Sequence, residues 1–204
     1  IRTIQSEDFL VPFVINNNLI SFIFAFKKRD KNKVFFDEKV WDGERIIDKN
    51  LLYEGNVSKF KIYEKISSMI SISESFEDGT ITLAVESKDR EYSYLINQMI
   101  LNDVDTFIRD KVIEKSQRRI EFLNKNSTNF INDLERENFL NLLAKEKIRL
   151  MNAEVSDFYS FQIIDKPDFP EEKSAPRRSL IVIFSTFLFM LFSIVNIIIR
   201  ERSD

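Results

Sequence analysis

The chain has 204 residues and a formal net charge of −3, and it contains neither cysteine nor histidine. Without cysteine there is no disulfide framework and no thiolate nucleophile, and without histidine the commonest general base and metal ligand are missing. Charges of both signs are interspersed, so no basic field points to nucleic acid. The length is sufficient for one medium-sized domain with a sizeable core.

The sequence lacks the usual signatures of catalysis. It has three glycines, and neither a G-x-x-x-x-G-K-[ST] nor a G-x-G-x-x-G motif. The close carboxylates at 133–137 and 171–172 are expected on solvated surface rather than in a pocket. We therefore expect no enzyme activity, no cofactor and no metal site.

Two short helices are expected at the start of the chain. Ser6 with Glu7 and Asp8 is typical of a helix start, because the serine can cap and the acids favour the first turn. The aromatic stretch 9–26 contains Pro12 and three asparagines, which favours two amphipathic helices, with a membrane span as the alternative. The basic run 27–33 (KKRDKNK) is expected to be a solvated loop, with contact to a membrane surface or to phosphate as the alternative.

A helix followed by a β-hairpin is predicted over 58–86. Apolar residues recur at helical spacing over 58–69, and alternation with polar residues then begins at Ile70. Asp78-Gly79 supplies the backbone conformation that a tight turn requires, and Ile81, Leu83 and Val85 resume the alternation.

One very long helix is expected over about 88–157. From Thr80 to Lys166 there is neither glycine nor proline, and apolar residues recur every three or four positions. At 1.5 Å per residue such a helix is roughly 100 Å long. The stretch 124–129 (NKNSTN) has low helix propensity, so we expect a kink or the tip of a helical hairpin there. Because a helix of this length needs a partner for its apolar stripe, a homo-oligomer is expected; the alternative is a compact bundle that folds back near Asn126.

A strand and a proline-rich segment are expected next. The sequence YSFQIID (159–165) predicts a strand that returns to the sheet. The segment 167–179 contains Pro167, Pro170 and Pro176, and prolines at this density favour an extended strut.

The apolar run 180–199 is expected to be a transmembrane helix. It contains no charge, and as a helix it is roughly 30 Å long, about the thickness of a hydrocarbon core. Ser185, Phe189, Ser193 and Asn196 fall at helical spacing and predict a stripe that contacts another helix. The alternative is a buried core helix of a soluble protein.

The expected fold is therefore an α+β membrane protein. Residues 1–166 form an extramembrane domain, in which a small α/β base carries the hairpin, the returning strand and the long helix. A proline-rich strut (167–179), a transmembrane helix (180–199) and a short cytoplasmic tail (200–204) follow. The chain begins at Ile1 rather than at a methionine, so a preceding segment is also expected.

The succession YSFQIID, KPDFPEEKSAPRR and the terminal apolar run resembles the Wzz chain-length determinant family, the bacterial polysaccharide co-polymerases. Pro176, Arg177 and Arg178 match the step that the family carries before its second membrane helix, and Pro167 and Pro170 match its earlier prolines. The stretches ITLAVESKDREYSYLINQMI and EKIRLMNAEVSDFYSFQIID are also similar to the family. This chain departs from the family in having no glycine in its terminal run and no N-terminal membrane helix.

The resemblance implies a non-catalytic oligomeric scaffold that regulates the chain length of an O-antigen-type polysaccharide. Its implied partners are further copies of itself, a Wzy-type polymerase, lipid-linked polysaccharide and the membrane. The implied location is the bacterial inner membrane, with most of the chain in the periplasm. A related scaffold for capsule or exopolysaccharide export, and an unrelated membrane-anchored coiled-coil adaptor, are the alternatives.

Overall fold

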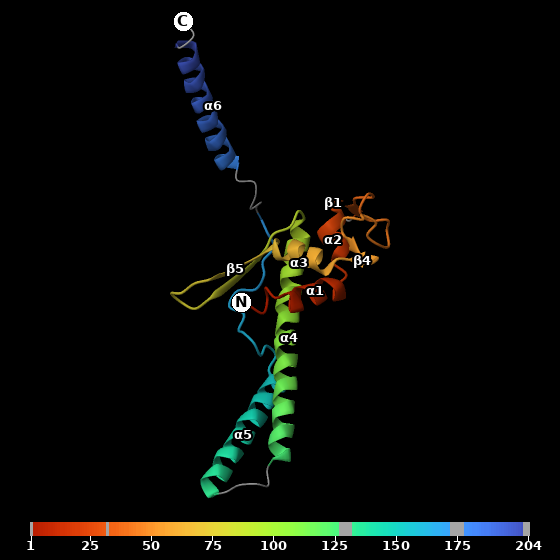
Figure 1. The fold of residues 1–204 in the computed structure, drawn as a ribbon, viewed down its shortest axis with the longest axis vertical. Helices are drawn as coiled ribbons and strands as arrows, with labels where there is room; N and C mark the ends of the chain where they lie inside the picture. The colour runs from red at the N-terminus through yellow and green to blue at the C-terminus, as the bar shows by residue number, and fades with distance from the viewer. Residues whose placement is uncertain (1, 32, 127–131, 172–177, 202–204) are drawn as a thin grey trace. The chain divides into compact units, whose positions relative to one another are not determined.

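The computed structural model describes residues 2–31, 33–126, 132–171 and 178–201. These residues fall into two compact units, Ile1–Phe169 and Pro170–Asp204. The first unit mixes helices with short strands, and Figure 1 shows its elements in chain order.

Two helices open the chain, as the sequence predicted. Helix α1 (Glu7–Asn16) carries Pro12 inside it, and helix α2 (Ile20–Ala25) follows after Asn18, whose φ of 53° turns the chain. At the end of α1, Asn17 Nδ2 donates to Asp103 Oδ2 at 2.7 Å, which ties this corner to a later helix.

The basic run 27–33 belongs to a hairpin, so the predicted loop is wrong. Strands β1 (Phe26–Asp30) and β2 (Lys33–Phe36) pair antiparallel. Phe36 on the second strand pairs with Phe26, and Phe35 pairs with Lys28, whose ammonium group lies over the Phe35 ring at 5.4 Å. A smaller pair, β3 (Leu52–Tyr53) with β4 (Asn56–Val57), follows.

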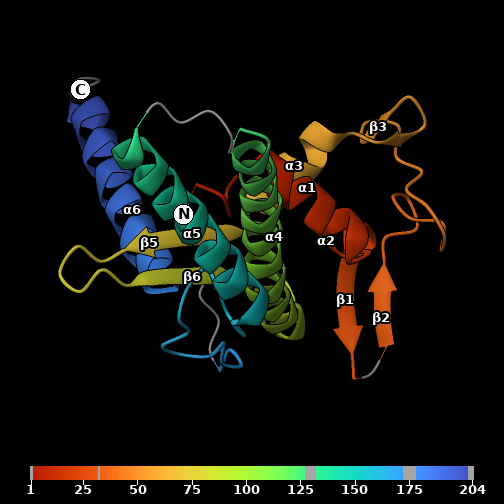
Figure 2. The same ribbon diagram turned by 90° about the horizontal axis from the view of Figure 1, so that it is seen from below.

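The predicted helix and hairpin at 58–86 are confirmed. Helix α3 (Lys59–Ser67) buries Ile62 and Ile66. Strands β5 (Ile70–Glu74) and β6 (Ile81–Val85) pair in a regular antiparallel register. Gly79 has a φ of +70° at the turn, which is the conformation that favours glycine. In Figures 1 and 2 the β1–β2 and β5–β6 ribbons lie on opposite sides of a long helix, α4.

The predicted single helix over 88–157 is wrong, because two helices occupy this stretch. Helix α4 (Arg90–Lys125) and helix α5 (Asp133–Val155) pack side by side, as both Figures 1 and 2 show. Asn126 caps the end of α4, and the Asn132 side chain accepts from the Glu135 N–H at 2.8 Å to begin α5. Residues 127–131 lie outside the described chain. Asn126, within the stretch 124–129, thus ends one helix and Asn132 caps the next, in agreement with the helical-hairpin alternative.

The core lies where α1, α3 and the start of α4 meet the base of the β5–β6 hairpin. Ile96, Ile100 and Val104 repeat every four residues along α4 and are fully buried. The side chains that pack around them from the other elements are Leu10, Val14, Ile62, Ile66 and Ile70. The first half of α4 is thus packed in the core, and its second half packs against α5.

The returning strand predicted over 159–165 is absent, and these residues have no helix or strand structure. The Tyr159 and Ser160 backbone N–H groups donate to Asp105 Oδ1 on α4, at 2.9 and 2.8 Å. Because these donors are already satisfied by a side chain, they do not join a sheet ladder.

Helix α6 (Arg178–Glu201) lies in the second unit, and the expected transmembrane helix over 180–199 is not confirmed. In the part of the chain that the structure describes, no helix combines the length and apolar character needed to cross a membrane. The expected α+β membrane protein is therefore corrected to a mixed helix-and-strand fold.

Candidate functional site: the cleft between α4 and α5

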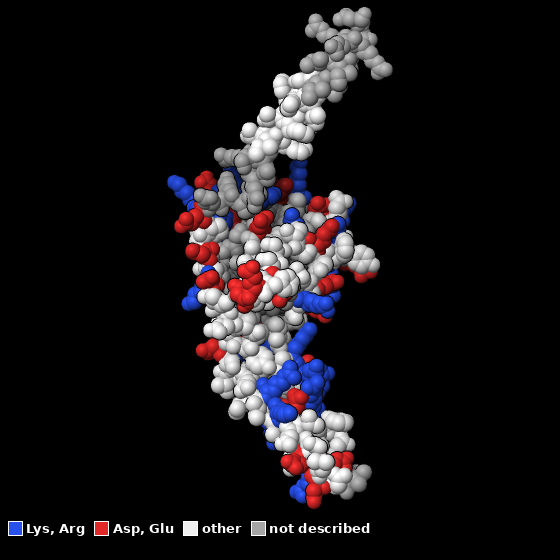
Figure 3. Space-filling view, turned by 90° about the vertical axis from the view of Figure 1, so that its left-hand side faces the viewer, with Lys and Arg blue, Asp and Glu red and all other residues white. Residues whose placement is uncertain are grey.

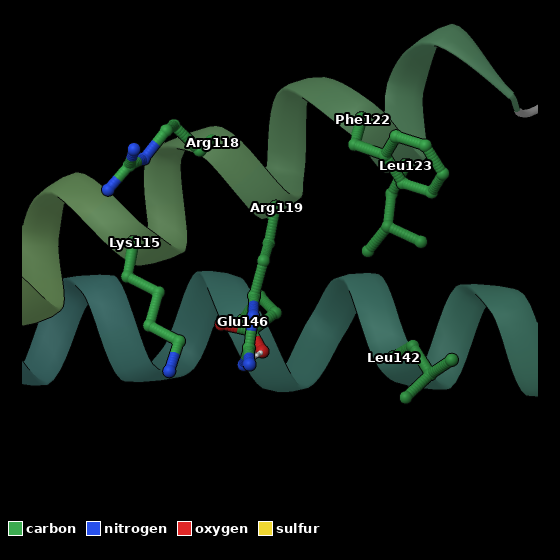
Figure 4. A pocket seen from close by; sticks show the side chains of 7 residues that line it. All are labelled: Lys115, Arg118, Arg119, Phe122, Leu123, Leu142 and Glu146. Carbon is green, nitrogen blue, oxygen red and sulfur yellow. Dashed lines mark hydrogen bonds and ion pairs between the residues drawn. The ribbon is translucent and has the colours of Figure 1, made fainter.

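An open cleft of about 600 Å³ lies between the paired helices α4 and α5. Figure 1 shows the two helices diverging toward the end of α4 and the start of α5. The cleft is lined by charged and apolar residues: Lys115, Arg118, Arg119, Phe122 and Leu123 from α4, with Leu142 and Glu146 from α5. Figure 4 shows Lys115 and Arg119 pointing from α4 toward α5.

Glu146 connects the two helices across the floor of the cleft. Arg119 Nη1 donates to Glu146 Oε1 at 2.6 Å, and Ser116 Oγ donates to Glu146 Oε2 at 3.2 Å. Burial by itself raises the pKa of Glu146, but the hydrogen bonds from Arg119 and Ser116 outweigh it and hold this pKa below its ordinary value. Glu146 is therefore ionised at neutral pH and neutralises Arg119.

The other two cations of the cleft are less fully compensated. Arg118 pairs with Glu114 at 3.3 Å, but both side chains are mostly exposed, and such surface pairs are weak. Among the described residues Lys115 has no ion pair. Figure 3 shows basic side chains gathered over the hairpin, with few acidic groups between them. The cleft thus carries an excess of positive charge.

The apolar part of the lining is open to solvent. Phe122 is 66% exposed and Leu142 is 54% exposed, and they lie on different helices. Exposed apolar side chains beside cations suit a ligand that has both an anionic group and an apolar surface.

A second polar cluster fastens the chain after α5 to the middle of α4. Arg109 Nη2 donates to Asp105 Oδ2 and to the Asp157 backbone oxygen, both at 2.7 Å. Burial raises the pKa of Asp105, but hydrogen bonds from Ser160, Arg109 and Tyr159 together lower it below its ordinary value. All these partners are internal, so the cluster is structural.

A third charged group surrounds the beginning of α4. Asp89, the N-cap residue, accepts from Arg29 Nε at 2.6 Å, and Arg29 also pairs with Glu91 at 2.6 Å. The Arg29 guanidinium lies 5.3 Å from the centre of the Tyr92 ring. Burial raises the pKa of Tyr92 to about 12, so this phenol keeps its proton and cannot serve as a general base near neutral pH.

The residues of the predicted proline motif are divided between the two units. Pro167 lies in the first unit and Pro170 begins the second. Between them, the Phe169 ring contacts Tyr94 at 5.9 Å and lies 5.2 Å from the Arg90 guanidinium carbon, both on the first turns of α4. Arg178 is the first residue of α6, and Pro176 and Arg177 lie outside the described residues.

The predicted contact stripe on α6 directs its hydroxyl groups to its own backbone. Ser185 Oγ donates to the Val182 oxygen at 2.9 Å, and Ser193 Oγ donates to the Phe189 oxygen at 2.9 Å. The Phe189 side chain is exposed. The side chain of Asn196 lies outside the described residues.

The cleft residues were not identified as a site from the sequence. The sequence pattern singled out none of Lys115, Arg118 and Glu146 as a binding residue. A signal does exist, since 115, 118, 119 and 122 fall on one side of a helix, but it has meaning only once α5 is known to face that side.

A scan against protein-family models finds no match to this chain, and a search of curated proteins also finds none. Within the described ranges, no group of three or more His, Cys, Asp or Glu side chains is placed to hold a metal ion.

Proposed function

We propose that this chain is a non-catalytic oligomeric scaffold that regulates polysaccharide chain length together with a Wzy-type polymerase and lipid-linked polysaccharide. The proposed location is the periplasmic side of the bacterial inner membrane. The likeness of the segments that begin at Ile81 and Glu146 to the Wzz family supports the biological role. One structural observation supports the scaffold role: α5 carries two apolar faces, and α4 covers only one of them.

The face of α5 that α4 covers is formed by residues that recur every three or four positions. Ala153 is fully buried, and Leu143, Glu146 and Leu150 are half-buried at heptad spacing from it. Glu146 contacts Arg119, which places this face against α4.

The outer stripe of α5 consists of Leu140, Ile148, Met151 and Val155. These side chains are 52%, 54%, 54% and 78% exposed, respectively. At 100° per residue they fall on one side of the helix, with Ala144 between them and well away from the covered face. A helix with this many exposed apolar residues on one side is typical of an interaction surface.

A second copy of the chain is the proposed occupant of the outer stripe. The stripe has the same three- or four-residue spacing as the face that already packs on α4, so another helix of this sequence fits it by the same side-chain interdigitation. A hairpin that buries its inner face within one subunit and its outer face between subunits would build an assembly of projecting hairpins. Such an assembly supplies repeated surfaces to a glycan or a polymerase without any chemistry of its own.

The assembly is tested with the purified full chain. We expect wild type to sediment as an oligomer and the double variant Ile148→Glu/Met151→Glu to sediment as a monomer, with unchanged helical content by circular dichroism. The matched control, Asn138→Glu/Asn152→Glu, adds two carboxylates to exposed positions of the same helix outside the stripe and should remain oligomeric. A wild-type monomer at all accessible concentrations would refute the scaffold.

The biological role is tested in the cells that carry the gene. Deletion should change the length distribution of the surface polysaccharide on a gel, wild type should restore it, and the monomeric variant should not. Membrane fractionation and periplasmic protease accessibility test the proposed location. If the length distribution is unchanged by deletion, the proposed function is wrong.

A further inference from the structure

The cleft between α4 and α5 has an excess of positive charge that its own acid does not remove. Glu146 neutralises Arg119 through a 2.6 Å hydrogen bond and is held in place by Ser116. Lys115 has no ion pair among the described residues, and Arg118 has only the exposed, 3.3 Å contact with Glu114. An anion that enters the cleft therefore meets cations without having to displace a buried ion pair.

Lys115 is the best placed of these cations. It lies on the side of α4 that faces α5, and Figure 4 shows its side chain pointing toward α5, as the Arg119 side chain does. Arg118 points away from α5 in the same view and lies at the edge of the cleft. A carboxylate or phosphate held by Lys115 is thus within the field of three cations, one of which is neutralised.

The apolar lining of the cleft favours ligands that also have an apolar surface. Phe122 follows Lys115 by seven residues, two turns further along α4, and its ring is largely exposed. The C–H face of a pyranose ring packs well on an exposed aromatic ring, because both surfaces are flat and weakly polar. With Leu142 opposite on α5, the cleft offers an apolar platform next to its cations.

We propose that this cleft binds a saccharide that carries an anionic group, with the sugar ring on Phe122 and the anion on Lys115, while Arg118 adds positive charge at the edge of the cleft. The anion-binding part rests on the cleft alone. The choice of a saccharide also rests on the proposed function, since a chain-length regulator meets a growing glycan. The same chemistry is offered by the carboxylate of an acidic sugar and by the phosphate of a lipid-linked precursor.

Binding is measured by isothermal titration calorimetry with the purified full chain and three probes. The probes are tetragalacturonate, which carries carboxylates, maltotetraose, a neutral α-1,4-linked saccharide of equal length, and inorganic phosphate. We expect tetragalacturonate to bind, maltotetraose to bind much more weakly, and phosphate to compete with tetragalacturonate. The affinity for tetragalacturonate should fall as salt rises, because the cations of the cleft are exposed.

Three variants assign the site. Lys115→Ala/Arg118→Ala should weaken tetragalacturonate binding by about tenfold or more, as expected when hydrogen bonds to charged groups are removed. Phe122→Ala should weaken tetragalacturonate but leave competition by phosphate intact. The control Lys59→Ala/Lys65→Ala removes the same charge from exposed positions of α3 and should bind like wild type. All of these side chains are exposed, so folding is expected to be unaffected, and circular dichroism checks it.

The outcomes separate the parts of the proposal. Failure of tetragalacturonate to bind, or equal binding by wild type and Lys115→Ala/Arg118→Ala, overturns the site. If phosphate competes but Phe122→Ala has no effect on tetragalacturonate affinity, the saccharide part of the proposal is wrong. The ligand of the cleft is then a phosphate group, either of a lipid carrier or free in solution. A chain that binds tetragalacturonate through the cleft but leaves glycan length unchanged in cells refutes the proposed function and not the site.

Discussion

Asp105, in the middle of α4, accepts two hydrogen bonds from Ser160 with a single carboxylate oxygen. The Ser160 N–H and Oγ each lie 2.8 Å from Asp105 Oδ1. The two residues are 55 positions apart in sequence, so this contact fixes where the chain goes after the α4–α5 hairpin. The second oxygen of Asp105 binds Arg109, which in turn holds the Asp157 backbone, so the end of the hairpin is fastened from both sides.

Replacing Asp105 with alanine should lower the free energy of unfolding by about 2–4 kcal/mol, because it removes the carboxylate that pairs with Arg109 and leaves the Tyr159 and Ser160 backbone N–H groups without their acceptor. Urea unfolding followed by circular dichroism measures the loss. Asp110→Ala, on an exposed position of the same helix, is the control and should have little effect. Equal losses for the two variants would show that the Asp105 cluster does not stabilise the fold.

Low pH should reduce the stability of the fold, because Asp105 becomes protonated. The pKa of Asp105 is lowered in the folded chain, while in the unfolded chain it has the ordinary value of about 3.9. The stability that ionised Asp105 contributes is therefore present above about pH 4 and is lost as pH falls through the lowered pKa. Unfolding free energies of wild type and Asp105→Asn, measured from pH 7 to pH 2, should converge as the pH falls. A difference that stays constant with pH would contradict this assignment.

The contact between Arg119 and Glu146 should contribute more to the free energy of unfolding than the similar contact between Arg118 and Glu114. Glu146→Ala removes a partly buried carboxylate from Arg119 and from the buried Ser116 hydroxyl, at a cost of about 1–2 kcal/mol. Glu114→Ala breaks an exposed pair and should cost no more than about 0.5 kcal/mol. A double-mutant cycle with Arg119→Ala measures the coupling, and zero coupling would mean that the pair does not join the two helices.

Two neighbouring residues of α4 should respond very differently to truncation. Ile96 is fully buried in the core, so Ile96→Ala should cost about 2–5 kcal/mol through lost burial and the cavity that remains. Leu95 is 40% exposed, and Leu95→Ala should cost less than about 1 kcal/mol. Chemical unfolding of both variants checks the orientation of α4 in the core, and a reversed order would place the wrong face of α4 inside.

Local patterns in the sequence were sufficient to predict several helices and strands. The β5–β6 hairpin followed from alternation and from Asp78-Gly79, whose backbone preference is set within four residues. Helix α3 followed from apolar residues at helical spacing, and the interruption between α4 and α5 followed from the asparagine-rich stretch 124–129. In the basic run 27–33 composition was misleading, because a charged strand can form when its partner strand carries the apolar residues.

Contacts between residues far apart in the sequence could not be predicted from the sequence. The pattern YSFQIID is typical of a strand, but whether it pairs depends on an acceptor placed about 55 residues earlier, Asp105, which takes the Tyr159 and Ser160 amides. The cleft depends in the same way on α5 folding back so that Glu146 meets Arg119 and Lys115 lies beside them.

The sequence by itself determined the helical and strand periodicities, the absence of cysteine and histidine, and the turn and cap residues, since each depends on neighbours along the chain. Only the tertiary structure decided that the long helical stretch is a hairpin, which face of α5 is covered, and which cations share a cleft. The physical reason is that side-chain pairing across α4 and α5 depends on the register of two helices, and no local propensity encodes that register.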